Sequence, residues 1–180
     1  MATSNGPILA NESPPARRAP LRLRMNNHVG RDHLDGGWWP QSRELDVELA
    51  DLVDHFPSRF SRIVRARYSR PDWEPARRRL RVAGGSVKVE SRASDDTHVI
   101  RLKTHDRTVL HLLVVPPEFT ADQGDEALLA AATIGNAHPA GDLLNTVTEH
   151  PDVDPIDLWS DEDGSWWGPG GPAPSFRGGG

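Results

Sequence analysis

The sequence of 180 residues contains no cysteine. This absence excludes disulfide bonds, thiolate zinc sites and a cysteine nucleophile, and it is compatible with a reducing compartment. No apolar run approaches the length of a membrane span, and the N-terminal residues lack the apolar core of a signal peptide. These absences predict a cytoplasmic protein that is soluble and has no membrane contact.

Standard catalytic and nucleotide-binding motifs are missing as well. The chain has no G-x-S-x-G, no H-E-x-x-H, no P-loop and no G-x-G-x-x-G after a predicted strand. Each of those chemistries needs its residues at a fixed spacing, so their absence disfavours these classes of enzyme. We therefore predict no catalytic residue and no cofactor, and the sequence favours a non-enzymatic protein.

Charges of opposite sign are separated along the chain, although the net charge is only −5. Residues 59–107 carry fourteen Lys/Arg against six Asp/Glu, whereas residues 118–180 carry one against twelve. A basic middle and an acidic end favour either association of the two segments with each other or a separate partner for each.

Composition divides the chain into three parts. Residues 1–19 are rich in Pro, Asn, Ser and Ala without periodicity, which predicts a disordered segment. Residues 20–146 show the patterns of an α+β domain. Residues 147–180 form an acidic tail rich in Trp, Gly and Pro, which is also predicted to be disordered.

An almost continuous apolar run at residues 109–115 predicts a strand that is covered on both faces, and Pro116 and Pro117 end it. Around this strand we predict a single antiparallel sheet of about five to six strands packed with two helices. Alternating patterns place the other strands at residues 21–25, 61–68, 78–82, 87–91 and 97–103.

A first hairpin is predicted at the Gly-Gly pair of residues 84–85, which favours a two-residue turn. In that register Arg79 lies opposite Glu90, and Arg81 lies opposite Lys88. Like charges directly opposite each other, as in the Arg81–Lys88 pair, are unfavourable by roughly a few tenths of a kcal/mol. An anionic partner near this pair of cations would relieve the repulsion.

A second hairpin is predicted at residues 105–106, joining the strand at 97–103 to the apolar strand. That register places Ile100 and His111 on the same face of the sheet. His98 then becomes a diagonal neighbour of His111. The surroundings are apolar, so we interpret both as core histidines that bond to backbone or water.

Apolar residues repeat at helical spacing between residues 45 and 56, which predicts a helix that Pro57 ends. Thr120 and Gln123 form a capping box for a second helix over residues 121–134. Residues 141–147 are predicted to add at most a short turn. The stripe of the first helix consists of Leu45, Leu49, Leu52, Val53 and Phe56.

Three segments together resemble a known family: LDGGWWPQSREL at residues 34–45, RRLRV at 78–82 and LLVVPP at 112–117. With Trp73 in a proline-bounded loop, this combination resembles an actinobacterial family known only as a domain of unknown function. Its members share a Leu-Asp-Gly-x-Trp-Trp-Pro opening and a late Leu-Leu-Val-Val-Pro-Pro strand. The resemblance covers roughly residues 20–140 and implies no activity, cofactor or catalytic residue.

Basic residues at alternate positions of the predicted strands are the strongest indication of function. An anionic partner, including nucleic acid, would need such charge together with aromatic rings for stacking. The alternatives are an ordinary solvated face for the cations and core positions for the tryptophans. The candidate binding residues are Trp38, Trp39, Trp73, Arg65, Arg67, Arg79, Arg81, Lys88 and Arg101, with Arg22, Arg24 and Lys103 in the same pattern.

Two hypotheses of function follow from these residues. The first is a non-enzymatic binding or regulatory domain whose basic sheet face takes an anionic partner or the acidic tail. The second is an enzyme with an unrecognised site around Asp35, His33, His98 and His111. His28, His33 and Asp35 lie within eight residues of one another, but loop histidines are usually solvated, so we predict no metal site.

Overall fold

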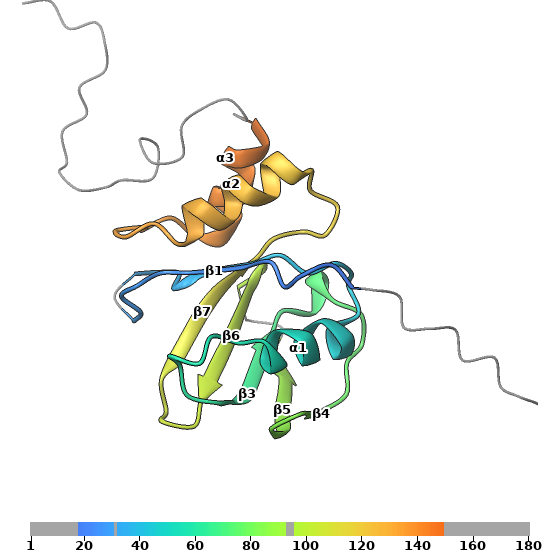
Figure 1. The fold of residues 1–180 in the computed structure, drawn as a ribbon. Helices are drawn as coiled ribbons and strands as arrows, with labels where there is room; N and C mark the ends of the chain where they lie inside the picture. The colour runs from blue at the N-terminus through green and yellow to red at the C-terminus, as the bar shows by residue number, and fades with distance from the viewer. Residues whose placement is uncertain (1–17, 31, 93–95, 150–180) are drawn as a thin grey trace, which may run out of the picture.

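The computed structural model describes residues 18–30, 32–92 and 96–149, and these form an α+β fold (Figure 1). The predicted disordered segments, residues 1–19 and 147–180, lie outside the described residues except at their inner ends. The strands are β1 (Leu23–Met25), β2 (Gly36–Trp38), β3 (Ile63–Tyr68), β4 (Arg79–Val82), β5 (Gly85–Ser91), β6 (Val99–Thr104) and β7 (Val109–Val114). The helices are α1 (Leu45–Asp54), α2 (Ala121–Ala131) and α3 (Ala140–Glu149), with a short 3-10 turn at Arg70–Asp72.

The strands form one seven-stranded sheet in the order β1-β2-β7-β6-β3-β5-β4. The prediction of an antiparallel sheet of five to six strands is wrong in this respect, because β2 runs parallel to β7 and β3 runs parallel to β5. The loop after β3 carries the chain to the sheet edge, where β4 forms. The hairpin then returns β5 between β4 and β3, which makes β5 parallel to β3.

Strand β2 is absent from the strands that the sequence predicts, and its two glycines remove side chains at two close approaches. A Cβ on Gly36 would lie 2.2 Å from the backbone oxygen of Arg24 in β1. A Cβ on Gly37 would lie 2.9 Å from a methyl carbon of Leu128 in α2. The two glycines therefore let β1 pair with β2 on one edge and let α2 pack directly onto β2.

Two of the three helices among the described residues agree with the sequence. Helix α1 has the predicted apolar stripe, and the capping box of Thr120 and Gln123 is present at the start of α2. Helix α3 is a correction, because the sequence predicts at most a short turn over residues 141–147. Its buried Leu143 and Val147 pack against α2, so tertiary contact rather than local propensity forms this helix.

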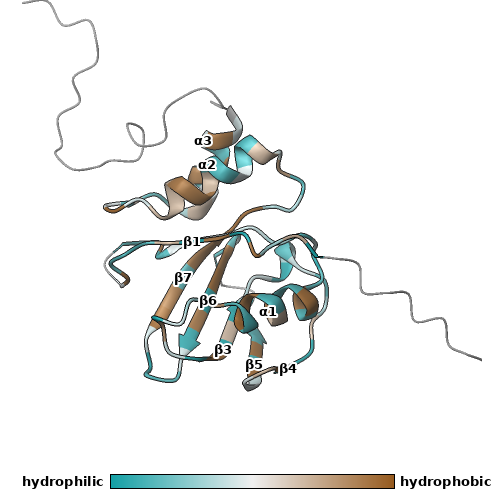
Figure 2. Cartoon of the chain, viewed as in Figure 1, coloured by the Kyte–Doolittle hydropathy of each residue, from teal (hydrophilic) through white to brown (hydrophobic). Residues whose placement is uncertain are grey.

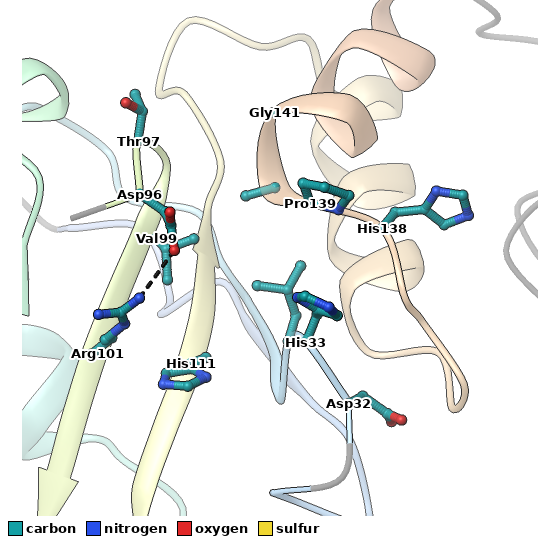
Figure 3. Close-up of a pocket in the computed structure, with 12 residues that line it drawn as sticks. Asp32, His33, Asp96, Thr97, Val99, Arg101, His111, His138, Pro139 and Gly141 are labelled. Atoms are coloured by element: carbon teal, nitrogen blue, oxygen red, sulfur yellow. Dashed lines mark hydrogen bonds and ion pairs between the residues drawn. The ribbon is translucent and has the colours of Figure 1, made fainter. Parts of the chain in front are cut away.

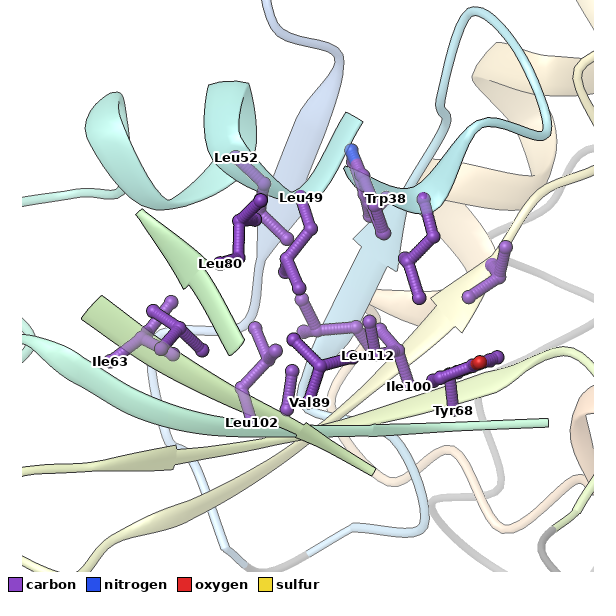
Figure 4. Close-up of a cluster of buried hydrophobic side chains, with 14 of the residues drawn as sticks. Trp38, Leu49, Leu52, Ile63, Tyr68, Leu80, Val89, Ile100, Leu102 and Leu112 are labelled. Carbon is purple, nitrogen blue, oxygen red and sulfur yellow. The ribbon is translucent and has the colours of Figure 1, made fainter. Parts of the chain in front are cut away.

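Helix α1 covers one face of the sheet (Figure 4). Leu49 and Leu52 from the helix and Trp38 from β2 point onto side chains that rise from the strands. The strand residues in this cluster include Ile63, Ala66, Leu80, Val87, Val89, Ile100, Leu102, Leu110, Leu112 and Val114.

Helices α2 and α3 cover the opposite face at one end of the sheet, over β1, β2 and β7. Trp39, Leu113 and Val115 pack there against the helices. From Leu112 onward, strand β7 is therefore buried on both faces, as its apolar run predicts, and most of the strand is brown in Figure 2. The core under α1 extends from β2 to β4, whereas α2 and α3 cover only part of the opposite face.

The register of the β6–β7 hairpin differs from the prediction by one residue. The loop has three residues, 105–107, and Arg107 adopts a positive φ of 73°, which is typical of a three-residue hairpin. Arg101 consequently lies opposite His111, and the predicted neighbours Ile100 and His111 lie on opposite faces. A shift of one residue exchanges the faces of a strand, so this loop decides which side His111 occupies.

The register of the β4–β5 hairpin differs by two residues. The turn lies at residues 83–84, one position earlier than predicted. Arg79 lies opposite Lys88 and Arg81 lies opposite Ser86, so both predicted pairings are wrong. An even shift leaves every side chain on its predicted face.

Candidate functional site

Four cations lie side by side across four neighbouring strands of the sheet. Lys103 of β6 lies opposite Arg65 of β3, Arg65 lies opposite Lys88 of β5, and Lys88 lies opposite Arg79 of β4. Neighbouring strands are about 4.8 Å apart, so these residues form a continuous row. We call them the cationic row.

More basic residues share this face of the sheet. Arg101 lies opposite Arg67, which in turn lies opposite Glu90, and Arg81 follows Arg79 at the next outward position of β4. The register therefore places the six basic binding candidates and Lys103 on one face. We define the cationic face as Arg65, Arg67, Arg79, Arg81, Lys88, Arg101 and Lys103.

The cationic face lies on the side of the sheet that α2 and α3 cover only at the other end. Within the described residues, the buried cluster under these helices reaches β7 and Val99 of β6 but includes no residue of β3, β4 or β5. The side chain of Lys88 is 51% exposed, and Arg79, Arg81 and Lys103 are also exposed. The face is therefore open to a partner.

Two carboxylates contact the cationic face in the described part of the chain. Glu90 lies 2.6 Å from the Nζ of Lys88 and 3.5 Å from a guanidinium nitrogen of Arg65. The hydrogen bond from Lys88 is the main cause that lowers the pKa of Glu90. Asp96 lies 3.0 Å from Arg101. Among the described residues, the seven cations of this face outnumber these two carboxylates.

Arg22 and Arg24 lie apart from the cationic face, which corrects the prediction that they belong to the same pattern. The guanidinium of Arg22 lies 3.6 Å from the ring centroid of Trp39 and donates hydrogen bonds to the carbonyl oxygens of Trp39 and Pro40. Burial lowers its pKa. Arg24 is in β1, at the opposite edge of the sheet from β4. Arg22 thus has a structural role, because it holds Trp39 and Pro40 on the face of the sheet that α2 covers.

The three tryptophans, which the sequence also offered as binding candidates, lie inside the protein, in agreement with the alternative of core positions. Trp38 and Trp73 are 1% and 7% exposed and stack on each other with ring centroids 5.2 Å apart. Trp39 is 5% exposed and donates from its indole nitrogen to the carbonyl of Pro116 at 3.1 Å. Trp38 and Trp39 point to opposite faces of the sheet, where each fills a core, so neither offers a ring to a base.

The four residues of the enzyme hypothesis do not meet in one place. Asp35 is buried, and its two carboxylate oxygens accept hydrogen bonds from the backbone N–H groups of Gly30 and His111. His98 lies 3.1 Å from the carboxylate of Asp72, and burial raises the pKa of that carboxyl group. The predicted proximity of His98 and His111 is wrong, because His111 lies on the other face of the sheet.

His33 and His111 do share a cavity of about 830 Å³ with Arg101, shown in Figure 3. Burial, followed by the charge of Arg101, lowers the pKa of His111. The sequence did not indicate this cavity, because its walls come from four distant segments. They are Asp32, His33, Leu34, Asp96, Thr97, Val99, Arg101, His111, His138, Pro139, Ala140 and Gly141. No cluster of metal ligands is present among the described residues.

In the part of the chain that the structure describes, every helix is too short or too polar to span a membrane. No curated protein and no solved structure matches the chain. A family model does match: that of the family of unknown function DUF5994, over residues 22–131, from the start of the sheet to the end of α2. This match covers more than half of the 180 residues and includes the LDGGWWP and LLVVPP segments. The chain therefore belongs to the DUF5994 family of unknown function.

Proposed function

We propose that this protein is a non-enzymatic binding domain whose cationic face holds the phosphate backbone of a nucleic acid duplex. The observation that carries the proposal is the cationic row, in which Lys103, Arg65, Lys88 and Arg79 lie on adjacent strands. Opposed like charges are unfavourable in a free sheet, and a row of phosphates relieves all of these repulsions at once.

The chemistry of the face favours phosphate over other anions. Five of its seven cations are arginines, and a guanidinium is a planar fork that matches phosphate oxygens in pairs. No aromatic side chain belongs to the cationic face, so it offers charge without stacking for single-stranded bases. Binding should therefore be independent of nucleotide sequence and strongly dependent on salt.

The cationic row predicts a measurable salt dependence. With four phosphate contacts, the logarithm of the association constant should fall with the logarithm of salt concentration at a slope of about −3.6. Affinity should then drop by about 100-fold between about 50 mM and about 200 mM salt. Fluorescence anisotropy of a labelled duplex of about 20 base pairs measures both values. The variant Arg79→Gln/Lys103→Gln should weaken binding and reduce the slope by about 2.

The matched control is Arg59→Gln/Arg77→Gln, which removes the same charge elsewhere. Arg77 pairs with Asp46 at 3.4 Å beside α1, and Arg59 lies against Phe60. If the control weakens binding as much as Arg79→Gln/Lys103→Gln does, net charge and not the cationic face is responsible. A wild-type chain that binds the duplex with no salt dependence contradicts the proposal outright.

The acidic residues after α3 should compete with the duplex. Residues 150–180 carry six Asp/Glu and one Arg, and they follow a helix that packs on the same side of the sheet as the cationic face. A chain that ends at Glu149 should bind the duplex more tightly than the full chain at low salt, and the difference should vanish at high salt. The cut follows Glu149 because Val147 is buried. Equal affinities of the two chains at low salt would show that these residues do not compete.

A further inference from the structure

A second site lies where the cationic face meets the start of α3. We propose that the cavity around Arg101, His111 and His33 binds a small organic carboxylate, with Arg101 holding the carboxylate group. This site is separate from the cationic row and does not depend on nucleic acid binding. Arg101 has Arg67 of β3 on one side and His111 of β7 on the other. The cavity lies on the β7 side, next to the connection between β1 and β2.

The size and walls of the cavity fit a small molecule. Its volume of about 830 Å³ falls in the range of ligand sites, which are mostly apolar with a few convergent polar groups. Leu34, Val99, Pro139 and Ala140 supply apolar wall from three separate segments of the chain. A hydrocarbon or aromatic body can bury its surface against these side chains.

The polar groups of the cavity favour a negative ligand. Arg101 reaches the wall from β6, and one of the groups that it contacts is Asp96, whose side chain is 71% exposed. An ion pair with so exposed a carboxylate is weak, so a ligand carboxylate can compete for the guanidinium. Asp32 also lines the cavity, but it accepts a hydrogen bond from Asn26 and points away from Arg101 in Figure 3.

Two imidazoles complete the site from opposite sides. His111 projects from β7 beside Arg101, and His33 lies across the cavity on the β1–β2 connection (Figure 3). The ring of His111 makes no hydrogen bond to the described residues. Its lowered pKa keeps it neutral at neutral pH, so one ring nitrogen can donate to a carboxylate oxygen. His138 lines the rim, and its ring is directed away from Arg101.

The test is a titration of the full chain with sodium benzoate at constant ionic strength, up to about 20 mM, because a fragment of this size binds with millimolar affinity. Benzamide, a neutral molecule of the same shape, is the matched ligand control. Two-dimensional NMR of the histidine rings reports contact at His111 and His33. Benzoate should shift both signals to saturation, whereas benzamide should leave them in place.

Variants separate the cavity from the cationic row. Arg101→Gln should weaken benzoate binding by about tenfold or more. His111→Asn should also weaken binding, although the positive charge of Arg101 is still present. Arg79→Gln/Lys103→Gln should leave benzoate binding unchanged, even where duplex binding is lost. Shifts that grow linearly without saturation, equal shifts with benzamide, or full affinity in both Arg101→Gln and His111→Asn would overturn the proposal.

Discussion

Gly36→Ala is expected to destabilise the protein by about 3 kcal/mol or more. A Cβ at this position would lie 2.2 Å from the carbonyl oxygen of Arg24 and 2.9 Å from the Cα of Met25. Both atoms belong to the backbone of β1 and cannot rotate away. Gly36 also has a φ of 154°, which side chains of L-residues rarely adopt.

The measurement is urea denaturation followed by circular dichroism, with Gly141→Ala as the matched control. No atom lies within 4 Å of a Cβ built on Gly141, which is in the first turn of α3. Alanine there should be neutral or stabilise by about 0.5 to 1 kcal/mol, because it lowers the entropy of the unfolded chain. A Gly36→Ala protein as stable as the wild type would show that β1 does not pair with β2 as described.

Asp35→Asn is expected to cost about 2 to 4 kcal/mol of stability. The buried carboxylate of Asp35 accepts two backbone hydrogen bonds, from Gly30 and, at 2.8 Å, from His111 in β7. Asparagine keeps the shape of the side chain but offers a single acceptor oxygen. Its NH₂ group would face one of the two N–H donors, leaving a buried donor without a partner.

Asp32→Asn is the matched control for this charge change. Asp32 is half-buried and accepts a hydrogen bond from the side chain of Asn26 at 2.9 Å. Its substitution should cost about 1 kcal/mol or less. Equal denaturation midpoints for Asp35→Asn and wild type would contradict the structural role of Asp35 and reopen a chemical role for that carboxylate.

These two residues explain much of the LDGGWWP segment as structure. Asp35 joins the β1–β2 connection to β7 by a hydrogen bond. The absence of a side chain lets β1 approach Gly36 and lets α2 approach Gly37. Trp38 and Trp39 then fill the cores on opposite faces. These five positions therefore serve packing and backbone hydrogen bonding.

Local patterns predicted the elements that depend on neighbours in the sequence. The stripe of α1 and the Thr120 capping box follow from helical spacing, and the alternating arginines of β3 and β4 follow from the two-residue period of a strand. The register of the two hairpins was harder to predict from the sequence. It depends on the number of residues in each turn, and the three-residue loop at 105–107 moved His111 to the face opposite the predicted one.

The sequence by itself determined that the chain builds a two-sided core and that its strands carry cations at every second position. Only the tertiary structure decided that Lys103, Arg65, Lys88 and Arg79 form one row, and that His33 and His111 share a cavity. The physical reason is that period and capping act within a few residues. Strand order and cavity walls instead join segments tens of residues apart, and loop lengths and the close packing of whole layers select that arrangement.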